Sequence, residues 1–272
     1  KEALEDVRTN GGFDVAHVPH GVVISLVSLS FGGALGPEAA LIGLAGGLGT
    51  RMGEESNKKP KPMVEIGGKP IIWHIMKRYS VYGINEFIIC SGHLGNIIED
   101  YFKECCENWK ITVVYTGDNV MTGGRLKKIE KYVKDETFCF TYGDSLNNAN
   151  ISNIIKFHKE RKKLATVTAC HPPEKYGVLK LEKDSVVDFE EKPERINEWV
   201  NAGYFVLEPQ IFKLIENDQT IWEKTPMKEL VFKDQLVAFK HEGFYKSMDT
   251  VADKNYLEKL WNGNKAEWKN WE

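Results

Sequence analysis

The apolar residues of the chain follow two alternating spacings from residue 39 onward. Helical spacing predicts helices at 70–82, 96–109, 123–133 and 151–162. Short runs rich in apolar and β-branched residues predict strands at 39–44, 86–90, 111–115, 136–142 and 165–169. Because a strand, a crossover helix and a second strand form a parallel pair, this order predicts an α/β fold. Its core is a Rossmann-like, mostly parallel sheet that is flanked by helices.

The pattern changes after Cys170. Apolar alternation around a Lys-Asp-Ser turn predicts a β-hairpin from 178–181 and 186–190. The remaining elements are short strands and a final helix, expected at 201–207, 236–243, 244–249 and 251–262. The C-terminal half therefore adds a small mixed β region to the parallel sheet.

The first 38 residues do not share this pattern. Residues 21–37 carry no charge and are rich in Gly and Ser, and Pro37 interrupts the run. A membrane-spanning helix needs roughly 20 apolar residues, so a membrane contact is disfavoured except through this stretch. We interpret 1–38 as an atypical apolar extension and 39–272 as one domain, with a buried helical hairpin as the competing interpretation of the extension.

Composition limits the classes of function. The chain has 36 Lys and Arg against 39 Asp and Glu, a formal charge of -3, so a strongly basic nucleic-acid binder is disfavoured. The five cysteines are odd in number and form no Cys-x-x-Cys pair. Reduced thiols in a cytoplasmic protein fit this pattern better than disulfides or a zinc site.

A glycine-rich loop after the first predicted strand is the first candidate for chemistry. In Leu44–Arg51 (LAGGLGTR) the glycines let backbone N–H groups approach a phosphate, and Arg51 adds a forked cation. The spacing matches neither a P-loop nor a dinucleotide-binding loop, and a simple tight turn is the alternative. Lys61 follows between Pro60 and Pro62, which favour an extended backbone that aims the lysine; a solvated basic loop is the alternative.

Two carboxylates follow predicted strands. Asp144 ends FCFTYGD and Asp249 ends FYKSMD. Ligands of open α/β sheets bind outside the carboxyl ends of strands, and Mg²⁺ prefers oxygen ligands. The pair is therefore a candidate Mg²⁺ site that bridges phosphates, although Asp249 could equally cap the helix that starts at Val251. Lys192 is either a further phosphate contact or a surface charge.

Together these segments carry a resemblance. Six segments resemble the sugar-1-phosphate nucleotidyltransferase family: LAGGLGTRM, KPKPMVEIGGKPIIWHIM, TGDNVMTGGRL, FTYGD, EKP and GFYKSMDT. The second and third resemble the sequences of its cytidylyltransferase branch. The resemblance covers about 41–272. It implies Mg²⁺-dependent formation of CDP-glucose and pyrophosphate from CTP and glucose 1-phosphate, a product used in bacterial lipopolysaccharide and O-antigen synthesis. It also implies a homo-oligomer.

The resemblance assigns roles to individual residues. It places the nucleotide and its phosphates against Leu44, Ala45, Gly46, Gly47, Leu48, Gly49, Thr50 and Arg51. Lys61 contacts the α-phosphate and, with Arg51, is catalytic. Arg125 and Gly143 line the nucleotide pocket, and Lys192 and Asn201 face the sugar phosphate. Asp144 and Asp249 hold the metal.

The sequence departs from the family pattern in four places. Residues 1–38 precede the first motif, and a segment that usually precedes VVYTGD is absent near 107–110. A neighbouring carboxylate is replaced in GDSLNN, and Asn-Gly-Gly reads Asn201-Ala202-Gly203. Two alternatives therefore stay open: an enzyme that uses UTP or dTTP, and an inactive chimeric homologue.

Overall fold

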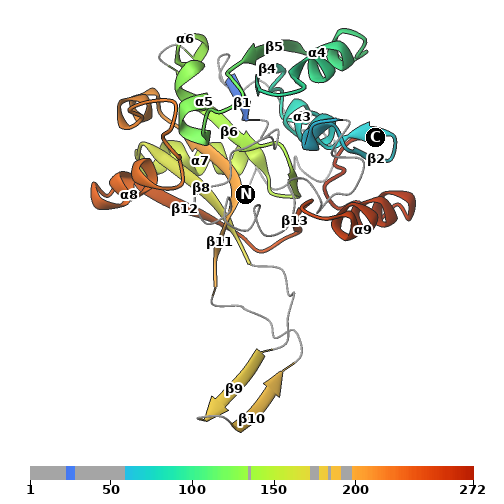
Figure 1. Ribbon diagram of the computed structural model, residues 1–272, viewed down its shortest axis with the longest axis vertical. Coiled ribbons are helices and arrows are strands. Elements are labelled where there is room, and N and C mark those ends of the chain that lie inside the picture. Colours follow the sequence, from blue (N-terminus) through green and yellow to red (C-terminus); the bar gives the residue numbers. More distant parts are fainter. Residues whose placement is uncertain (1–22, 28–58, 134–135, 172–177, 183–184, 191–197) are drawn as a thin grey trace, which may run out of the picture.

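The fold is built on a seven-stranded sheet (Figure 1). The computed structural model describes residues 23–27, 59–133, 136–171, 178–182, 185–190 and 198–272. In the order in which they lie side by side, the strands are β12 (Leu236–His241), β8 (Ala165–Cys170), β11 (Val200–Leu207), β6 (Phe138–Tyr142), β1 (Val23–Val27), β4 (Glu86–Ser91) and β5 (Lys110–Tyr115). β11 runs antiparallel to both neighbours, and the other pairs are parallel. The expected mostly parallel α/β sheet is present.

Helices cover both faces of this sheet. One face carries α3 (Ile71–Val81), α4 (Gly95–Lys103) and α7 (Ile151–Arg161). The other carries α5 (Thr122–Lys128), α6 (Glu130–Val133), the 3-10 helix η4 (Pro209–Leu214) and α8 (Thr225–Phe232). Successive β4 residues supply the two cores in turn, with Phe87 in the first and Ile88 in the second. This is the alternation expected of a strand that is buried on both faces.

Two helices differ from the prediction. The first, α4, ends at Lys103 instead of 109, because Trp109 turns inward to pack on Phe87 with ring centroids 5.4 Å apart. The helix expected at 123–133 is divided at Ile129. There the backbone N–H of Ile129 tightens the turn by bonding to Leu126 and Lys127, and the side chain is buried. Periodicity alone does not reveal either break, because the apolar positions continue through both.

The apolar N-terminal run contributes to the sheet centre. Val23–Val27 forms β1, in parallel register with both β4 and β6. For these residues the helical hairpin interpretation is wrong, and the β-branched, uncharged sequence VISLV explains why a central strand forms. The strand expected at 39–44 lies outside the described residues, and the domain boundary at residue 38 stays a prediction. No helix in the described ranges is long and apolar enough to cross a bilayer.

Three small antiparallel pairs complete the fold. They are β2 (Glu65–Ile66) with β3 (Lys69–Pro70), β7 (Ser145–Asn147) with β13 (Tyr245–Ser247), and β9 (Val178–Glu182) with β10 (Ser185–Glu190). The last is the predicted hairpin, and Figure 1 shows it projecting away from the main sheet. The cysteines, all within the described residues, form no disulfide, as expected.

The C-terminal tail, residues 263–272, follows the last helix, α9 (Val251–Asn262), and packs on α3 through aromatic rings. His74 is fully buried. Its Nε2 contacts the Ile66 carbonyl at 2.8 Å, and the Trp268 indole N–H donates to its Nδ1 at 3.4 Å. The imidazole is therefore neutral and carries its proton on Nε2. His74 and Trp268 therefore have a structural role in this core.

The buried His74 should make the protein less stable in mild acid. Burial lowers the pKa of His74 to about 4, whereas the unfolded chain titrates near 6.5. Below pH 6.5 the unfolded state binds the extra proton, so this contribution is complete above that value and is lost as the pH falls toward 4. From His74 alone we expect the free energy of unfolding in urea to fall by about 2 kcal/mol between pH 7.5 and pH 5. His74→Gln, which does not titrate here, should remove most of this difference; an unchanged pH dependence would contradict the assignment.

The turn between β2 and β3 lies directly beneath α9. The Gly67 N–H donates to the Glu258 carboxylate at 3.0 Å, and a Cβ on Gly67 would overlap the Trp261 ring. Gly67 and Gly68 both have a positive φ, of +59° and +74°, but a Cβ on Gly68 would meet no atom within 4 Å. This pair separates backbone strain from a steric clash.

We expect Gly67→Ala to destabilise the chain more than Gly68→Ala. Gly68→Ala should cost about 1 kcal/mol for the left-handed backbone alone. Gly67→Ala adds the clash with Trp261, so its loss in urea denaturation should be about twice as large or more. An equal decrease in the free energy of unfolding for the two variants would show that Trp261 does not restrict the side chain at residue 67.

Candidate active site

Lys61 lies at the start of a short 3-10 helix, η3 (Lys61–Met63), and is largely buried. Pro60 is extended, with ψ of 148°, as predicted. The predicted extended backbone ends there, however, because Met63 donates its N–H to the Pro60 carbonyl at 2.8 Å and Pro62 accommodates the helical φ. The turn fixes the lysine backbone just before the β2–β3 hairpin.

The pairing of β7 with β13 brings two distant carboxylates together. Asp144 directly precedes β7, and Ser247 of β13 lies opposite Ser145. The Met248 N–H donates to the Asp144 carbonyl at 2.8 Å, so Asp249 follows immediately beside it. A register set by backbone hydrogen bonds therefore places the two side chains at one edge of the sheet.

The Lys61 ammonium lies between these carboxylates. Its Nζ is 2.6 Å from Asp144 Oδ2 and 2.9 Å from Asp249 Oδ1. Burial alone would lower the pKa of Lys61, but the two carboxylates raise it above its usual value. Burial alone would likewise raise the pKa of Asp249, yet Lys61 and the Ser247 hydroxyl lower it. The cluster therefore contains one cation and two anions, with a local net negative charge.

Asp249 does not cap α9. Thr250 is the N-cap residue, and Asp253 completes a capping box with it. Asp253 Oδ2 also accepts the Asp249 N–H at 3.1 Å, and its other oxygen contacts the Lys246 ammonium. These contacts hold the backbone at Asp249 and leave its carboxylate free to pair with Lys61. The alternative that Asp249 caps α9 is therefore wrong.

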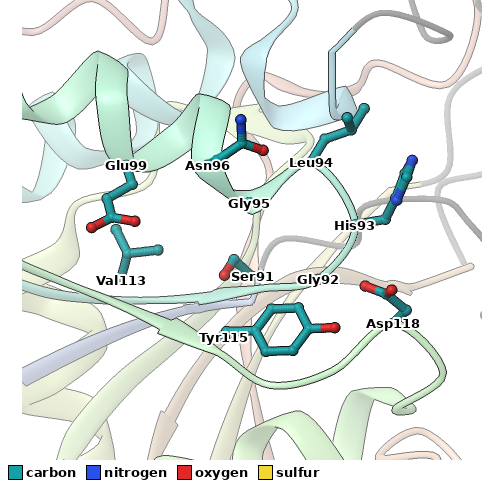
Figure 2. Close-up of a pocket in the computed structure, with 10 residues that line it drawn as sticks. All are labelled: Ser91, Gly92, His93, Leu94, Gly95, Asn96, Glu99, Val113, Tyr115 and Asp118. Carbon is teal, nitrogen blue, oxygen red and sulfur yellow. The ribbon is translucent and has the colours of Figure 1, made fainter.

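A pocket of about 390 Å³ lies where β4 and β5 end (Figure 2). The loop from Gly92 through His93 and Leu94 turns into α4 on one side, and Tyr115 and Asp118 lie on the other. Because β4 and β6 both run parallel to β1, their carboxyl ends, and so this pocket and Asp144, lie on the same edge of the sheet.

Arg125 supports this pocket from behind. Its guanidinium is buried and donates to Thr116 Oγ1 at 2.6 Å and to the Ser91 carbonyl at 3.1 Å. A Cβ on Gly92 would lie 2.9 Å from the guanidinium, so any larger residue there would displace the Arg125 side chain. The structure thus places Arg125 behind the lining residues Ser91 and Gly92, and direct contact with a nucleotide stays a prediction.

Of the other residues predicted for the site, the structure describes Gly143 and Asn201. Gly143 is buried between β6 and Asp144. Asn201, on β11, accepts the Gly203 N–H at 2.8 Å, and its side chain acts to lower the pKa of Tyr142 at the end of β6. The glycine-rich loop at 44–51, with Arg51, and Lys192 lie outside the described residues, so their roles stay predictions.

The paired carboxylates fit a hard divalent cation. Among the described residues no group of three or more His, Cys, Asp or Glu side chains forms a complete protein cage. Mg²⁺ does not need one, because it is commonly bound by one or two carboxylates together with substrate phosphates. The half-buried side chains of Asp144 and Asp249 supply this donor set.

The fold and site define a class: an α/β protein with an acidic and basic cluster at the strand ends where phosphorylated ligands bind. Residues 40–265 match the family described as nucleotidyl transferase, and the chain belongs to this family.

Individual proteins extend this comparison. The chain is 49% identical to glucose-1-phosphate cytidylyltransferase of Salmonella typhi over 252 residues, which covers 84% of this chain and 98% of the relative. It is 38% identical, with the same coverage, to the probable glucose-1-phosphate cytidylyltransferase of Bacillus subtilis (strain 168). Its fold is similar to that of UDP-glucose pyrophosphorylase from Acinetobacter baumanii, with a TM-score of 0.65 at 18% identity, covering 90% of this chain and 95% of that structure.

Some residues of the site were not predicted. His93 and Asp118 line the pocket, and the Tyr142 hydroxyl donates a hydrogen bond to Glu223. The rule for strand ends could have indicated His93 and Tyr142, since each follows or ends a predicted strand. Nothing in the local sequence around Glu223 indicates its position, because it lies on an irregular segment that only the tertiary fold brings to this edge.

Proposed function

We propose that this chain transfers the CMP moiety of CTP to α-D-glucose 1-phosphate and so forms CDP-glucose and pyrophosphate. The identity to glucose-1-phosphate cytidylyltransferases over nearly their whole length supports this substrate pair. The single structural observation that carries the proposal is the contact of one buried ammonium, on Lys61, with both Asp144 and Asp249. Opposite charges concentrated at one point suit a reaction between two phosphorylated substrates.

The reaction needs positioning more than a reactive side chain. A phosphate oxygen of glucose 1-phosphate attacks the α-phosphorus of CTP, the bond to the β-phosphate breaks, and pyrophosphate leaves with that electron pair. Because the attacking phosphate is already ionised, no protein nucleophile or strong base is required. Alignment of the two phosphates and neutralisation of their charge carry the rate.

The residues of this chain divide these tasks. Lys61 contacts the α-phosphate, and its raised pKa keeps the ammonium charged throughout the physiological range. Asp144 and Asp249 would hold Mg²⁺, which when bound neutralises phosphate charge and orients the substrates. Arg51 in the loop 44–51 would bind the departing phosphates, and Asn201 and Lys192 would contact the sugar phosphate. The homo-oligomer expected from the resemblance stays a prediction.

A nucleotide panel tests this function. The full chain is incubated with glucose 1-phosphate and CTP, UTP or dTTP, with and without Mg²⁺, and products are separated by mass spectrometry. We expect CDP-glucose with CTP and Mg²⁺, and little product without the metal or with the other nucleotides. UDP-glucose or dTDP-glucose as the main product would overturn the nucleotide assignment, and no nucleotide sugar in any mixture would overturn the activity.

A further inference from the structure

Glu223 bridges two parts of the candidate site that come from distant segments of the chain. Its Oε1 accepts a hydrogen bond from the Tyr142 hydroxyl. Its Oε2 accepts one from the Thr122 hydroxyl at 2.7 Å. Tyr142 ends β6, two residues before Asp144, whereas Thr122 is the first residue of α5 and of the Thr-Gly-Gly-Arg segment that contains Arg125. One carboxylate therefore connects the strand of the proposed metal ligand with the helix behind the pocket.

The directions of these hydrogen bonds are fixed by chemistry. An ionised carboxylate only accepts, so both hydroxyls must donate to Glu223. The Thr122 oxygen is then left to accept the backbone N–H of Trp222, at 2.9 Å. The Tyr142 oxygen is left to accept from the Asn201 amide. Burial and then the Glu223 carboxylate raise the pKa of Tyr142 well above its usual value, so the phenol keeps the proton that it donates.

Asn201 is fixed in turn by the backbone. Its Oδ1 accepts the Gly203 N–H at 2.8 Å, so its NH₂ group is the end that faces Tyr142. Gly203 has a φ of +78°, and a Cβ there would lie 2.5 Å from the Tyr142 ring. The Tyr142 ring therefore packs closely against β11 at Gly203, and its hydroxyl is bonded to Glu223.

The other end of the bridge is equally close. The N–H groups of Met121 and Gly123 donate to the carbonyls of Asp218 and Thr220, at 2.8 and 2.9 Å. A Cβ on Gly123 would lie 2.7 Å from the Thr220 carbonyl oxygen. The segment that carries Glu223 and the start of α5 therefore move together if either moves.

We infer that Glu223 is a positioning residue that couples nucleotide binding, at the Thr122–Arg125 side, to sugar-phosphate binding, at the Asn201 side. This inference rests on the proposed function, which assigns the sugar phosphate to the Asn201 side, and on the nucleotide role that the resemblance predicts for Arg125. A displacement of α5 by the nucleotide moves Thr122, and the shared carboxylate passes the displacement to Tyr142 and Asn201. By linkage the sugar phosphate has the same effect on nucleotide affinity.

Glu223→Gln tests this coupling with little change in volume. An amide presents a donor on one side, so either Tyr142 or Thr122 must reverse its hydroxyl and lose its second partner. We measure the affinity for glucose 1-phosphate by calorimetry, with and without α,β-methylene-CTP, in the presence of Mg²⁺. In the unmodified chain we expect the nucleotide analogue to raise this affinity about tenfold. In Glu223→Gln that factor should fall close to one, while the analogue still binds alone.

Two further variants make the result decisive. Glu229→Gln is the matched control, because this α8 carboxylate pairs only with Lys233 among the contacts found for it, and it should leave the tenfold factor of the unmodified chain unchanged. Tyr142→Phe removes one hydroxyl from the bridge and should lower the factor even if Glu223→Gln does not fold. The inference would be overturned if the analogue raised the affinity for glucose 1-phosphate equally in the unmodified chain, Glu223→Gln and Tyr142→Phe. It would also be overturned if the analogue did not raise this affinity in the unmodified chain. Formation of CDP-glucose by the unmodified chain tests the proposed function separately, so the two failures are distinguishable.

Discussion

Lys61→Met should strongly reduce turnover. The ammonium lies 2.6 Å from Asp144 and 2.9 Å from Asp249, and in the proposed reaction it neutralises charge on the α-phosphate. Loss of one preorganised stabilising group of this kind typically lowers kcat by about 10²–10³-fold. Methionine keeps most of the length of the side chain, so the loss is one of charge more than of packing. Steady-state rates at saturating substrates give the measurement.

The effect of Lys61→Met on stability should be smaller than its effect on rate. The Asp249 side chain is 45% exposed, so solvent screens this carboxylate when the cation is gone. Lys59→Met is a matched control from the same loop, because among the described residues Lys59 pairs with Glu65, at 2.9 Å and at the surface. That variant should keep its rate within about twofold and its unfolding free energy within about 0.5 kcal/mol. A Lys61→Met enzyme as fast as the Lys59→Met enzyme would remove Lys61 from the reaction.

Asp144→Asn should also abolish most turnover, for a different reason. The substitution keeps the shape of the side chain and one oxygen, but it removes the charge that a divalent cation requires. The several kcal/mol that such a cation contributes correspond to a decrease in kcat of roughly 10²–10⁴-fold. Because Asn is a poor Mg²⁺ ligand, raising the Mg²⁺ concentration should recover only part of the rate.

Its control is Asp100→Asn on α4. The Asp100 side chain is 69% exposed and pairs with Lys103 at 3.2 Å, so its charge acts at the surface only. That variant should show the Mg²⁺ dependence of the unmodified chain. If Asp144→Asn retains normal Mg²⁺-dependent activity, the proposed metal ligand is wrong.

Much of the fold follows from the spacing of apolar residues. α9 begins and ends where the pattern predicts, and the strands β4, β6 and β8 occupy their predicted ranges to within two residues. These elements are long or strongly apolar, so local preference and tertiary burial agree. The ends of α4 and α5 could not be predicted, because Trp109 and Ile129 leave the helix to reach the core and the sequence does not show that distant partner.

The candidate site is partly readable from the sequence for a similar reason. Asp144, Asp249 and Lys61 each stand beside a strand end or a proline-bounded loop, and the structure brings these three together. The structure contradicts the sequence-based alternative that Asp249 caps α9, because the cap belongs to Thr250 and Asp253. The positions of Glu223 and of Arg125, which lies behind the pocket, depend on contacts across the fold that no local pattern encodes.

The most direct test of the central claim is Mn²⁺ binding, measured by electron paramagnetic resonance in the presence of α,β-methylene-CTP. The Asp144 and Asp249 carboxylates, on either side of Lys61, are proposed to share one divalent ion with the nucleotide. We predict stoichiometric Mn²⁺ binding to the unmodified chain and to Asp100→Asn, and a strong loss of affinity in both Asp144→Asn and Asp249→Asn. Unchanged Mn²⁺ binding in the latter two variants would contradict the account.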